Sequence, residues 1–376
     1  NGDHQDGVGH YQMTEREGRR WSAADAYLRP AMQRRNLTLE TEANATQLIF
    51  KGDRTAGVRY IRNGAVCEAS ARREISLACG AVKTPQLLML SGIGPAEELR
   101  THQIPVVVES PAVGEGLHDH PMCLTGWRTP TVRNLWEDIT PENLELWQRE
   151  RRGPMASFGA EIGGFARSRR DRLAPDLQFG AIPGPPPLPG FGPPTERAVG
   201  TLVGAVDVRS RGRVMLASAD PAAKPIIDPR YFADEADLDV LVAGIRMARD
   251  IAAHEPLAGI TAGEIMPGPE INDDEQIREW IRGTSGTMFH PTGTCAMGGG
   301  AEAVCDPELR VRGIEGLRVV DASVMPATPR GNTNAPTIAI AERAADLIRG
   351  NRPLSVAARE RVHTRVEHRP TTTTRA

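Results

Sequence analysis

The sequence predicts a mixed α/β protein built from two parts. Its 376 residues exceed what one compact domain usually holds. Patterns typical of strands and patterns typical of helices follow one another along the chain. Hydrophobic residues make up 40% and charged residues 25%, which is ordinary for a globular protein.

The first third of the chain is expected to hold one helix, a hairpin and the start of a second helix. Ser22 is a plausible N-cap for a helix over residues 22–35, with Asp25 three residues later. An apolar helix is expected to open at Pro85, after the Gly80-Ala81 turn. Alternation predicts strands over residues 37–50, 56–62 and 74–79.

The middle of the chain changes character. Residues 126–200 form a polar stretch punctuated by tryptophans, with a Pro- and Gly-rich loop near its end. Apolar residues repeat with helical spacing over 237–252, which predicts an amphipathic helix. A second helix is expected after Asn272, with Glu275 as its capping partner. Strands are expected around residues 203–208 and 213–216.

The last third is expected to bring a buried strand close to an apolar helix. Residues 317–320 are typical of a short buried strand, and residues 337–348 of a helix that is apolar over most of its surface. Pro336 suits the first turn of that helix, because its missing N–H has no partner there in any case. Residues 351–376 are expected to form a disordered tail.

Charge and cysteine content exclude several classes of protein. The net charge of −3 provides no positive field for nucleic acid. The apolar runs are far shorter than a membrane span. Five widely spaced cysteines predict neither a disulfide framework nor a zinc site, so we expect a reducing, cytoplasmic setting.

His290 is the first candidate for chemistry. Pro291 restricts the backbone of His290 to an extended state, and a Thr-Gly-Thr turn follows over residues 292–294. Such a loop holds one imidazole rigidly. A single histidine is more often a buried side chain with satisfied hydrogen bonds, so its context decides between the two interpretations.

The His118-Asp119-His120 segment looks at first like a metal site. On a strand, His118 and His120 would share one face. Two imidazoles and one carboxylate do not complete a zinc ligand set, and no third ligand stands out nearby. We therefore predict no metal site.

The segment before the apolar helix is a candidate anion or ring site. Residues 331–336 read Gly-Asn-Thr-Asn-Ala-Pro, and either asparagine could simply cap the helix. A helix N-terminus also presents free N–H groups and a partial positive charge. Small residues at 321–323, after the buried strand, would allow close backbone approach to a phosphate or ribityl chain.

The stretch from Gly80 to Gly94 is the most specific pattern, with two glycine turns bracketing an apolar helix. It resembles the second signature of the glucose–methanol–choline (GMC) oxidoreductase family. His290-Pro291 with Gly293-Thr294 is similar to that family's catalytic histidine segment. Further matching segments occur over residues 18–22, 113–121, 210–214, 319–323 and 332–336, so the resemblance covers about residues 7–350 and favours a bacterial, choline dehydrogenase-like branch.

The resemblance implies an FAD-dependent enzyme that oxidises a small alcohol. His290 would be the base, and Asn334, 44 residues later, would occupy the family's second catalytic position. The electron acceptor would be oxygen or a quinone-type molecule, and both alternatives stay open. The FAD contacts it implies are Ala45, Gly80, Ala81, Asp321, Ala322, Asn332 and Thr333.

The fold it implies is the GMC-type FAD-binding fold, incomplete at its N-terminus. The family's opening strand and G-x-G-x-x-G turn are not matched, and Gly116 and His118 replace the usual Asn and Gln. The implied parts are 1–125 (the rest of the FAD-binding domain), 126–285 (a substrate domain with an antiparallel sheet flanked by helices) and 286–350 (a return to the FAD domain).

Three alternatives remain beside this reading. One is a hydroxynitrile lyase, a non-redox member of the same family. Another is an inactive or partner-dependent fragment that lacks the pyrophosphate cradle. The third is an unrelated binding module, which the ordered series of motifs disfavours.

Overall fold

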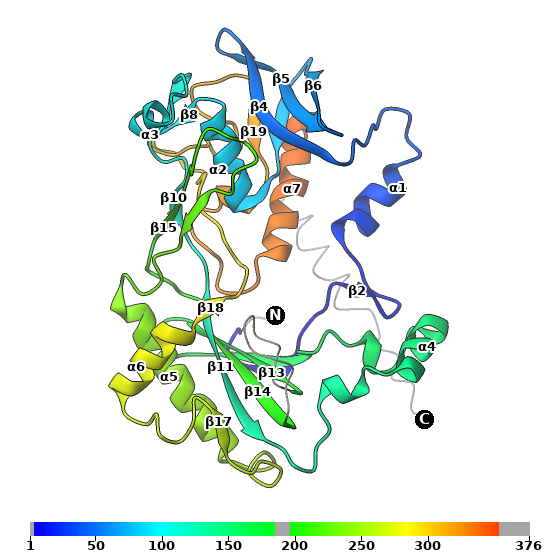
Figure 1. The fold of residues 1–376 in the computed structure, drawn as a ribbon, viewed down its shortest axis with the longest axis vertical. Coiled ribbons are helices and arrows are strands. Elements are labelled where there is room, and N and C mark those ends of the chain that lie inside the picture. The colour runs from blue at the N-terminus through cyan, green and yellow to red at the C-terminus, as the bar shows by residue number, and fades with distance from the viewer. Residues whose placement is uncertain (1–3, 185–195, 353–376) are drawn as a thin grey trace.

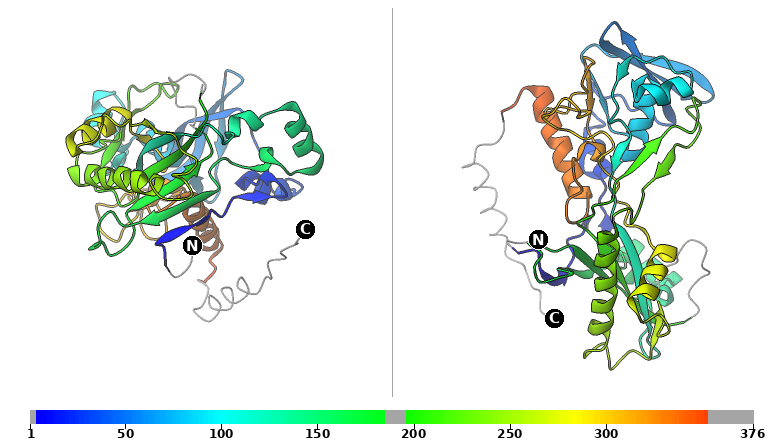
Figure 2. Two further views of the ribbon diagram at one scale, coloured as in Figure 1. Left: turned by 90° about the horizontal axis from the view of Figure 1, so that it is seen from below. Right: turned by 90° about the vertical axis from the view of Figure 1, so that its left-hand side faces the viewer.

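The structure is a computed structural model that describes residues 4–184 and 196–352. It confirms a mixed α/β fold with an antiparallel sheet and helices. Two lobes are stacked along the long axis of the molecule, and each surrounds its own hydrophobic cluster (Figures 1 and 2). The tail predicted from residue 351 lies outside the described residues from 353 onward.

The lower lobe of Figure 1 is built on a seven-stranded antiparallel sheet. Two of its strands, β12 and β13, lie in the stretch that the sequence pattern did not assign to any element. The spatial order is β1 (Gly7–His10), β12 (Ile162–Ala166), β13 (Leu177–Ile182), β14 (Ala198–Ala205), β11 (Pro121–Arg128) and β17 (Glu264–Met266), and β18 (Gly286–Thr287) pairs with the other end of β11.

Helices α5 (Glu235–Ala252) and α6 (Asp274–Thr284) pack beside this sheet (Figure 2). The apolar face of α5 was correctly predicted, and its side chains are fully buried against β14. Gly244 allows this approach, because a Cβ there would lie 2.4 Å from Val203 Cγ1. The α6 cap differs from the prediction by one position: Asp273 is the N-cap and Gln276 its partner.

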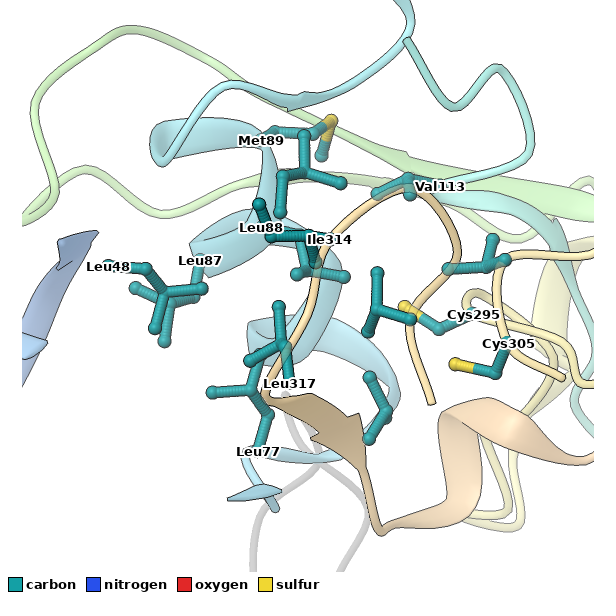
Figure 3. Packing of buried hydrophobic residues seen from close by; sticks show 14 of the residues in the cluster. Leu48, Leu77, Leu87, Leu88, Met89, Val113, Cys295, Cys305, Ile314 and Leu317 are labelled. Atoms are coloured by element: carbon teal, nitrogen blue, oxygen red, sulfur yellow. The ribbon is translucent and has the colours of Figure 1, made fainter. Parts of the chain in front are cut away.

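The upper lobe combines a three-stranded meander with a short parallel pair. Residues of α2, β4, β7 and β19 meet in its hydrophobic cluster, as Figure 3 shows for Leu48, Leu88 and Leu317. The meander is β4 (Ala43–Lys51), β5 (Arg54–Arg62) and β6 (Ala65–Ser70), the pair is β7 (Ile75–Leu77) and β19 (Leu317–Val319), and the main helices are α2 (Gly80–Leu90) and α7 (Asn334–Arg349).

Helix α2 begins at Gly80, earlier than predicted, and contains Pro85. A proline inside a helix has no N–H, so the carbonyl four residues earlier loses its partner. That carbonyl belongs to Ala81, and the Thr294 hydroxyl donates to it at 2.6 Å. The loop after His290 is thereby fastened to α2.

The remaining elements are short and mostly connect the lobes or lie along their edges. They are β2 (Glu15–Arg16), β3 (Arg19–Arg20), η1 (Ala24–Leu28), α1 (Arg29–Ala31), β8 (Ile93–Gly94), α3 (Ala96–Thr101), β9 (Val108–Glu109), β10 (Glu115–Leu117), η2 (Leu135–Asp138), α4 (Pro141–Glu150), η3 (Pro154–Ala156), β15 (Gly212–Met215), β16 (Ile226–Asp228) and η4 (Ala322–Val324).

Two local predictions were correct in type but too long. The expected helix over residues 22–35 is a π-helical turn, η1, followed by only one short turn, α1. The expected strand over 37–50 begins at Ala43. The predicted contact at the helix start is present, since Ser22 and Asp25 bond each other's backbone N–H groups. Among the described residues, no helix is long and apolar enough to cross a bilayer.

Candidate active site

Three segments that are far apart in sequence meet where the two lobes join. Residues 118–120 connect β10 to β11, residues 288–290 follow β18, and residues 330–333 precede α7. Strand β13 of the lower sheet adds Gln178 to the same place. The hydrogen bonds described below join these segments to one another.

Asp119 holds two of these segments together. Its Oδ1 accepts hydrogen bonds from the backbone N–H groups of His120 at 2.8 Å and His290 at 2.9 Å. Its Oδ2 accepts from the hydroxyl of Tyr231 at 2.5 Å and from the hydroxyl of Thr287. Asp119 is buried. One carboxylate therefore fixes the backbone of His290 against the 118–120 segment.

His290 and His120 are in direct contact. Their Nδ1 atoms are 2.9 Å apart, and the two rings meet nearly perpendicular, at 88°. Both are buried, with 6% of His290 and none of His120 exposed. Burial lowers the pKa of His290, although Asp119 opposes this, and burial together with His290 lowers the pKa of His120 to about 3. Both rings are therefore neutral at pH 7.

Asn332, rather than Asn334, is the asparagine that reaches His290. Asn332 Nδ2 lies 3.2 Å from His290 Nε2, while Asn332 Oδ1 accepts a hydrogen bond from Gln178 Nε2 at 3.3 Å. The side chain of Asn334 instead donates to Thr14 Oγ1 at 3.3 Å on the exposed surface. Asn332, 42 residues after His290, thus contacts the histidine, whereas Asn334, the expected residue 44 positions after it, does not.

Asp321 and Gly80, two of the expected cofactor contacts, meet each other. Asp321 Oδ2 accepts from the Gly80 N–H at 2.9 Å and from the Thr84 hydroxyl at 2.6 Å. Asp321 Oδ1 accepts from both the N–H and the hydroxyl of Ser323. The carboxylate is thus fully used within the protein, and it substitutes for a side-chain cap at the start of α2, where Cys79 provides none.

Asp321 thus forms a joint between the end of β19 and the start of α2. Some of the other expected cofactor contacts lie around this joint, and others lie apart from it. Ala81 offers its carbonyl to Thr294, and Ala322 opens the short turn η4 directly after Asp321. Thr333 precedes α7 without a side-chain capping bond. Ala45 lies on β4, paired with Tyr60 in the hairpin.

Several site residues were missed at the level of sequence. Asp119 and His120 were considered only as metal ligands, although Asp119-His120-Pro121 was among the matching segments. Nothing in the local pattern singled out Gln178. The described part of the chain shows no group of three or more His, Cys, Asp or Glu side chains arranged to bind a metal. A cavity of about 530 Å³ lies elsewhere, against β19 and residues 310–316, and none of the site residues lines it.

Comparison with known proteins places this geometry in context. Two GMC oxidoreductase family models match the chain, over residues 1–122 and 208–341. An alcohol dehydrogenase [acceptor] of Pseudomonas putida is 42% identical over 358 residues, which cover 93% of this chain and 64% of that protein. Human mitochondrial choline dehydrogenase is 41% identical over 359 residues, covering 93% of this chain and 60% of that protein.

Solved structures agree with the sequence comparison. Pyridoxine 4-oxidase from "Mesorbium loti" superposes with a TM-score of 0.81 at 29% identity, covering 93% of this chain and 65% of that chain. A variant of Aspergillus oryzae formate oxidase, in which FAD modification was studied, superposes with a TM-score of 0.86 at 28% identity, covering 92% and 66%. The chain thus spans less than two thirds of the length of these relatives.

Proposed function

Because the chain belongs to the GMC oxidoreductase family, we propose that the protein oxidises a primary or secondary alcohol to an aldehyde or ketone with FAD as its cofactor. The observation that carries this proposal is the buried, neutral His290 whose Nε2 faces the amide of Asn332. The relatives named for alcohol and choline support an alcohol as the substrate class.

His290 is the proposed base. An alcohol gives up a hydride readily only as its hydroxyl proton leaves, so a base must lie within hydrogen-bond reach of that hydroxyl. Burial lowers the pKa of His290, so the imidazole is in its accepting, neutral form at pH 7. Asp119 holds the His290 backbone N–H, and this fixes where the ring stands.

Asn332 is the proposed partner of the base. Its Nδ2 already lies 3.2 Å from His290 Nε2, so a substrate hydroxyl at Nε2 would also contact this amide. A hydrogen bond from the amide would hold the substrate oxygen for transfer. The sequence-based expectation gave this role to Asn334, and the contacts support Asn332 in its place.

The residues present fit a flavin beside this pair. Helix α7 starts directly after Asn332 and Thr333 with no side-chain cap, so its first N–H groups and positive end suit a ring that gains negative charge. Asn332, Thr333, Gly80, Ala81, Ala322 and Ala45 are the residues that would hold FAD. The bound flavin would supply the acceptor for the hydride of the carbinol carbon.

A panel of primary and secondary alcohols tests this function. The protein is loaded with FAD and mixed with each alcohol without oxygen, and flavin absorbance is followed. Bleaching by at least one alcohol, lost in His290→Ala, is the expected result. Cleavage of cyanohydrins without bleaching by any alcohol would contradict it and would favour a lyase.

A further inference from the structure

We propose that Gln178, acting through Asn332, is a positioning residue that holds His290 in the tautomer with its proton on Nδ1 and with Nε2 unprotonated, able to accept. The inference rests on the proposed function for its catalytic meaning, but the tautomer itself is a property of this chain. It follows from the donor and acceptor roles along a continuous series of hydrogen bonds, which begins at the backbone carbonyl of Phe179.

The chain of hydrogen bonds starts at the carbonyl of Phe179, which can only accept. The hydroxyl of Tyr11 contacts this carbonyl and must therefore donate to it. The Tyr11 oxygen is then left as an acceptor toward Gln178, whose amide lies 3.2 Å away. Only the NH₂ end of Gln178 can satisfy it, so the orientation of this amide is determined.

The same NH₂ group determines the orientation of Asn332. Gln178 Nε2 has a second hydrogen, and it points to Asn332 at 3.3 Å, where only Oδ1 can accept it. Asn332 must then turn its own NH₂ group toward His290 Nε2 at 3.2 Å. Since that group donates, His290 Nε2 carries no proton.

The far side of the ring completes the assignment. A neutral imidazole without a proton on Nε2 carries it on Nδ1, and His290 Nδ1 lies 2.9 Å from His120 Nδ1. His120 therefore accepts at Nδ1 and keeps its own proton on Nε2. Neither ring is free to reverse this order unless Gln178 and Tyr11 reverse as well.

The arrangement leaves two buried polar atoms at the site unpaired among the described residues. His120 Nε2 and Gln178 Oε1 are buried with no hydrogen-bond partner in the described part of the chain. Each such buried group costs about 1–3 kcal/mol. Gln178, which sets the order of donors and acceptors, and His120, which accepts from His290, lie at the two sides of the Asn332–His290 pair.

The test replaces the hydrogen-bond donor at residue 178 by an acceptor. In Gln178→Glu a carboxylate can only accept, so Asn332 should turn its NH₂ group toward it and present Oδ1 to His290. His290 should then carry its proton on Nε2. Gln178→Met removes the donor without imposing the opposite order. Gln276→Glu in the α6 cap adds the same charge away from the site and keeps the oxygen that accepts from the Asn272 and Asp273 N–H groups, so it is the control.

The readout is the protonation of each ring nitrogen in long-range ¹H–¹⁵N spectra of ¹⁵N-histidine-labelled protein, at a pH well above the ordinary histidine value of 6.5. The His290→Ala variant identifies the His290 signals among the nine histidines. We expect Nδ1–H in the wild type and in Gln276→Glu, and Nε2–H in Gln178→Glu. Tyr11→Phe, which removes only one hydroxyl, should give a mixture.

Flavin reduction by alcohol gives a second readout. Gln178→Glu should slow it at least about a hundredfold with little change in KM, and Gln178→Met by about tenfold. A wild-type spectrum with Nε2–H on His290, or a Gln178→Glu spectrum with the tautomer unchanged, would overturn the inference. Expected spectra in a protein that oxidises no alcohol would support the inference and overturn the proposed function.

Discussion

Two buried aspartates fasten the two functional regions of this molecule. Asp321 joins the end of β19 to the start of α2 inside the upper lobe, and Asp119 joins the segments around His290 between the lobes. Each side chain is at most 8% exposed, and each accepts hydrogen bonds from four donors.

The difference lies in what surrounds each carboxylate. The donors at Asp321 are two backbone N–H groups and two hydroxyls, and none of its partners is left with an unpaired buried atom in the described residues. The site that Asp119 holds contains His120 and Gln178, each with one unpaired buried atom. Asp321 thus joins elements within the upper lobe, whereas Asp119 fixes the segment that carries the proposed base.

The largest expected effect is at the structural joint. Asp321→Ala would leave the N–H of Gly80 and the two donors of Ser323 without an acceptor inside the upper lobe. The free energy of unfolding should therefore fall by about 3–5 kcal/mol. Urea unfolding followed by circular dichroism measures it. Asp171→Ala, an exposed control, should change the value by less than about 0.5 kcal/mol. A loss near the control would mean that Asp321 is not a structural joint.

The next effect should appear in rate rather than in stability. His290→Ala should slow flavin reduction by alcohol at least about a hundredfold, because it removes the base. Its free energy of unfolding should fall by less than that of Asp321→Ala, because Asp321→Ala leaves four donors without their acceptor. Stopped-flow reduction and urea unfolding on the same samples separate the two. A rate within a few fold of wild type would show that His290 is not the base.

Acid should destabilise the fold through the buried histidines of the 118–120 segment. Burial, with Arg211 nearby, lowers the pKa of His118 to about 4, and burial lowers that of His120 to about 3. Below pH 6.5 these histidines bind protons in the unfolded chain but stay neutral in the folded one. The free energy of unfolding therefore falls as the pH drops from 6.5 toward 4. Above 6.5 both states are neutral and the two groups contribute nothing.

The slope should be about 1.4 kcal/mol per pH unit for each of these histidines. His118→Asn keeps an acceptor for the Thr328 N–H and should give a shallower acid slope in urea unfolding measured at several pH values. Equal slopes in wild type and variant would show that His118 is not buried in its neutral form.

The smallest expected effects distinguish the two asparagines. Asn332→Ala should slow flavin reduction by roughly tenfold, the value of about one hydrogen bond in the transition state. Asn334→Ala should stay within about twofold, because its side chain only contacts Thr14 on the surface. If steady-state kinetics showed the larger loss in Asn334→Ala, the residue 44 positions after His290 would be the partner of the base, and the role of Asn332 would be contradicted.

The choice between these asparagines shows where sequence reasoning stopped. Both occupy one short motif before α7, and Asn332 of this motif lies beside His290. Which of the two reaches His290 depends on the path of the intervening 41 residues, including the turn at 321–324, and a one- or two-residue difference in that path moves the contact. Gln178 was missed for a related reason, because its strand β13 has no local pattern that distinguishes it.

The family could be recognised from sequence patterns alone, and so could the helix over 237–252 and the motifs around His290 and residues 331–336. These depend on residues close together in the chain, whose spacing can be read directly. The surroundings of His290 could not be read in this way. Its hydrogen bond to Asp119, its contacts with His120 and Asn332, and the bond from Gln178 to Asn332 are visible only in the folded chain. Those contacts join residues 42 to 171 positions apart, and each forms only once the sheet and both lobes have folded around it.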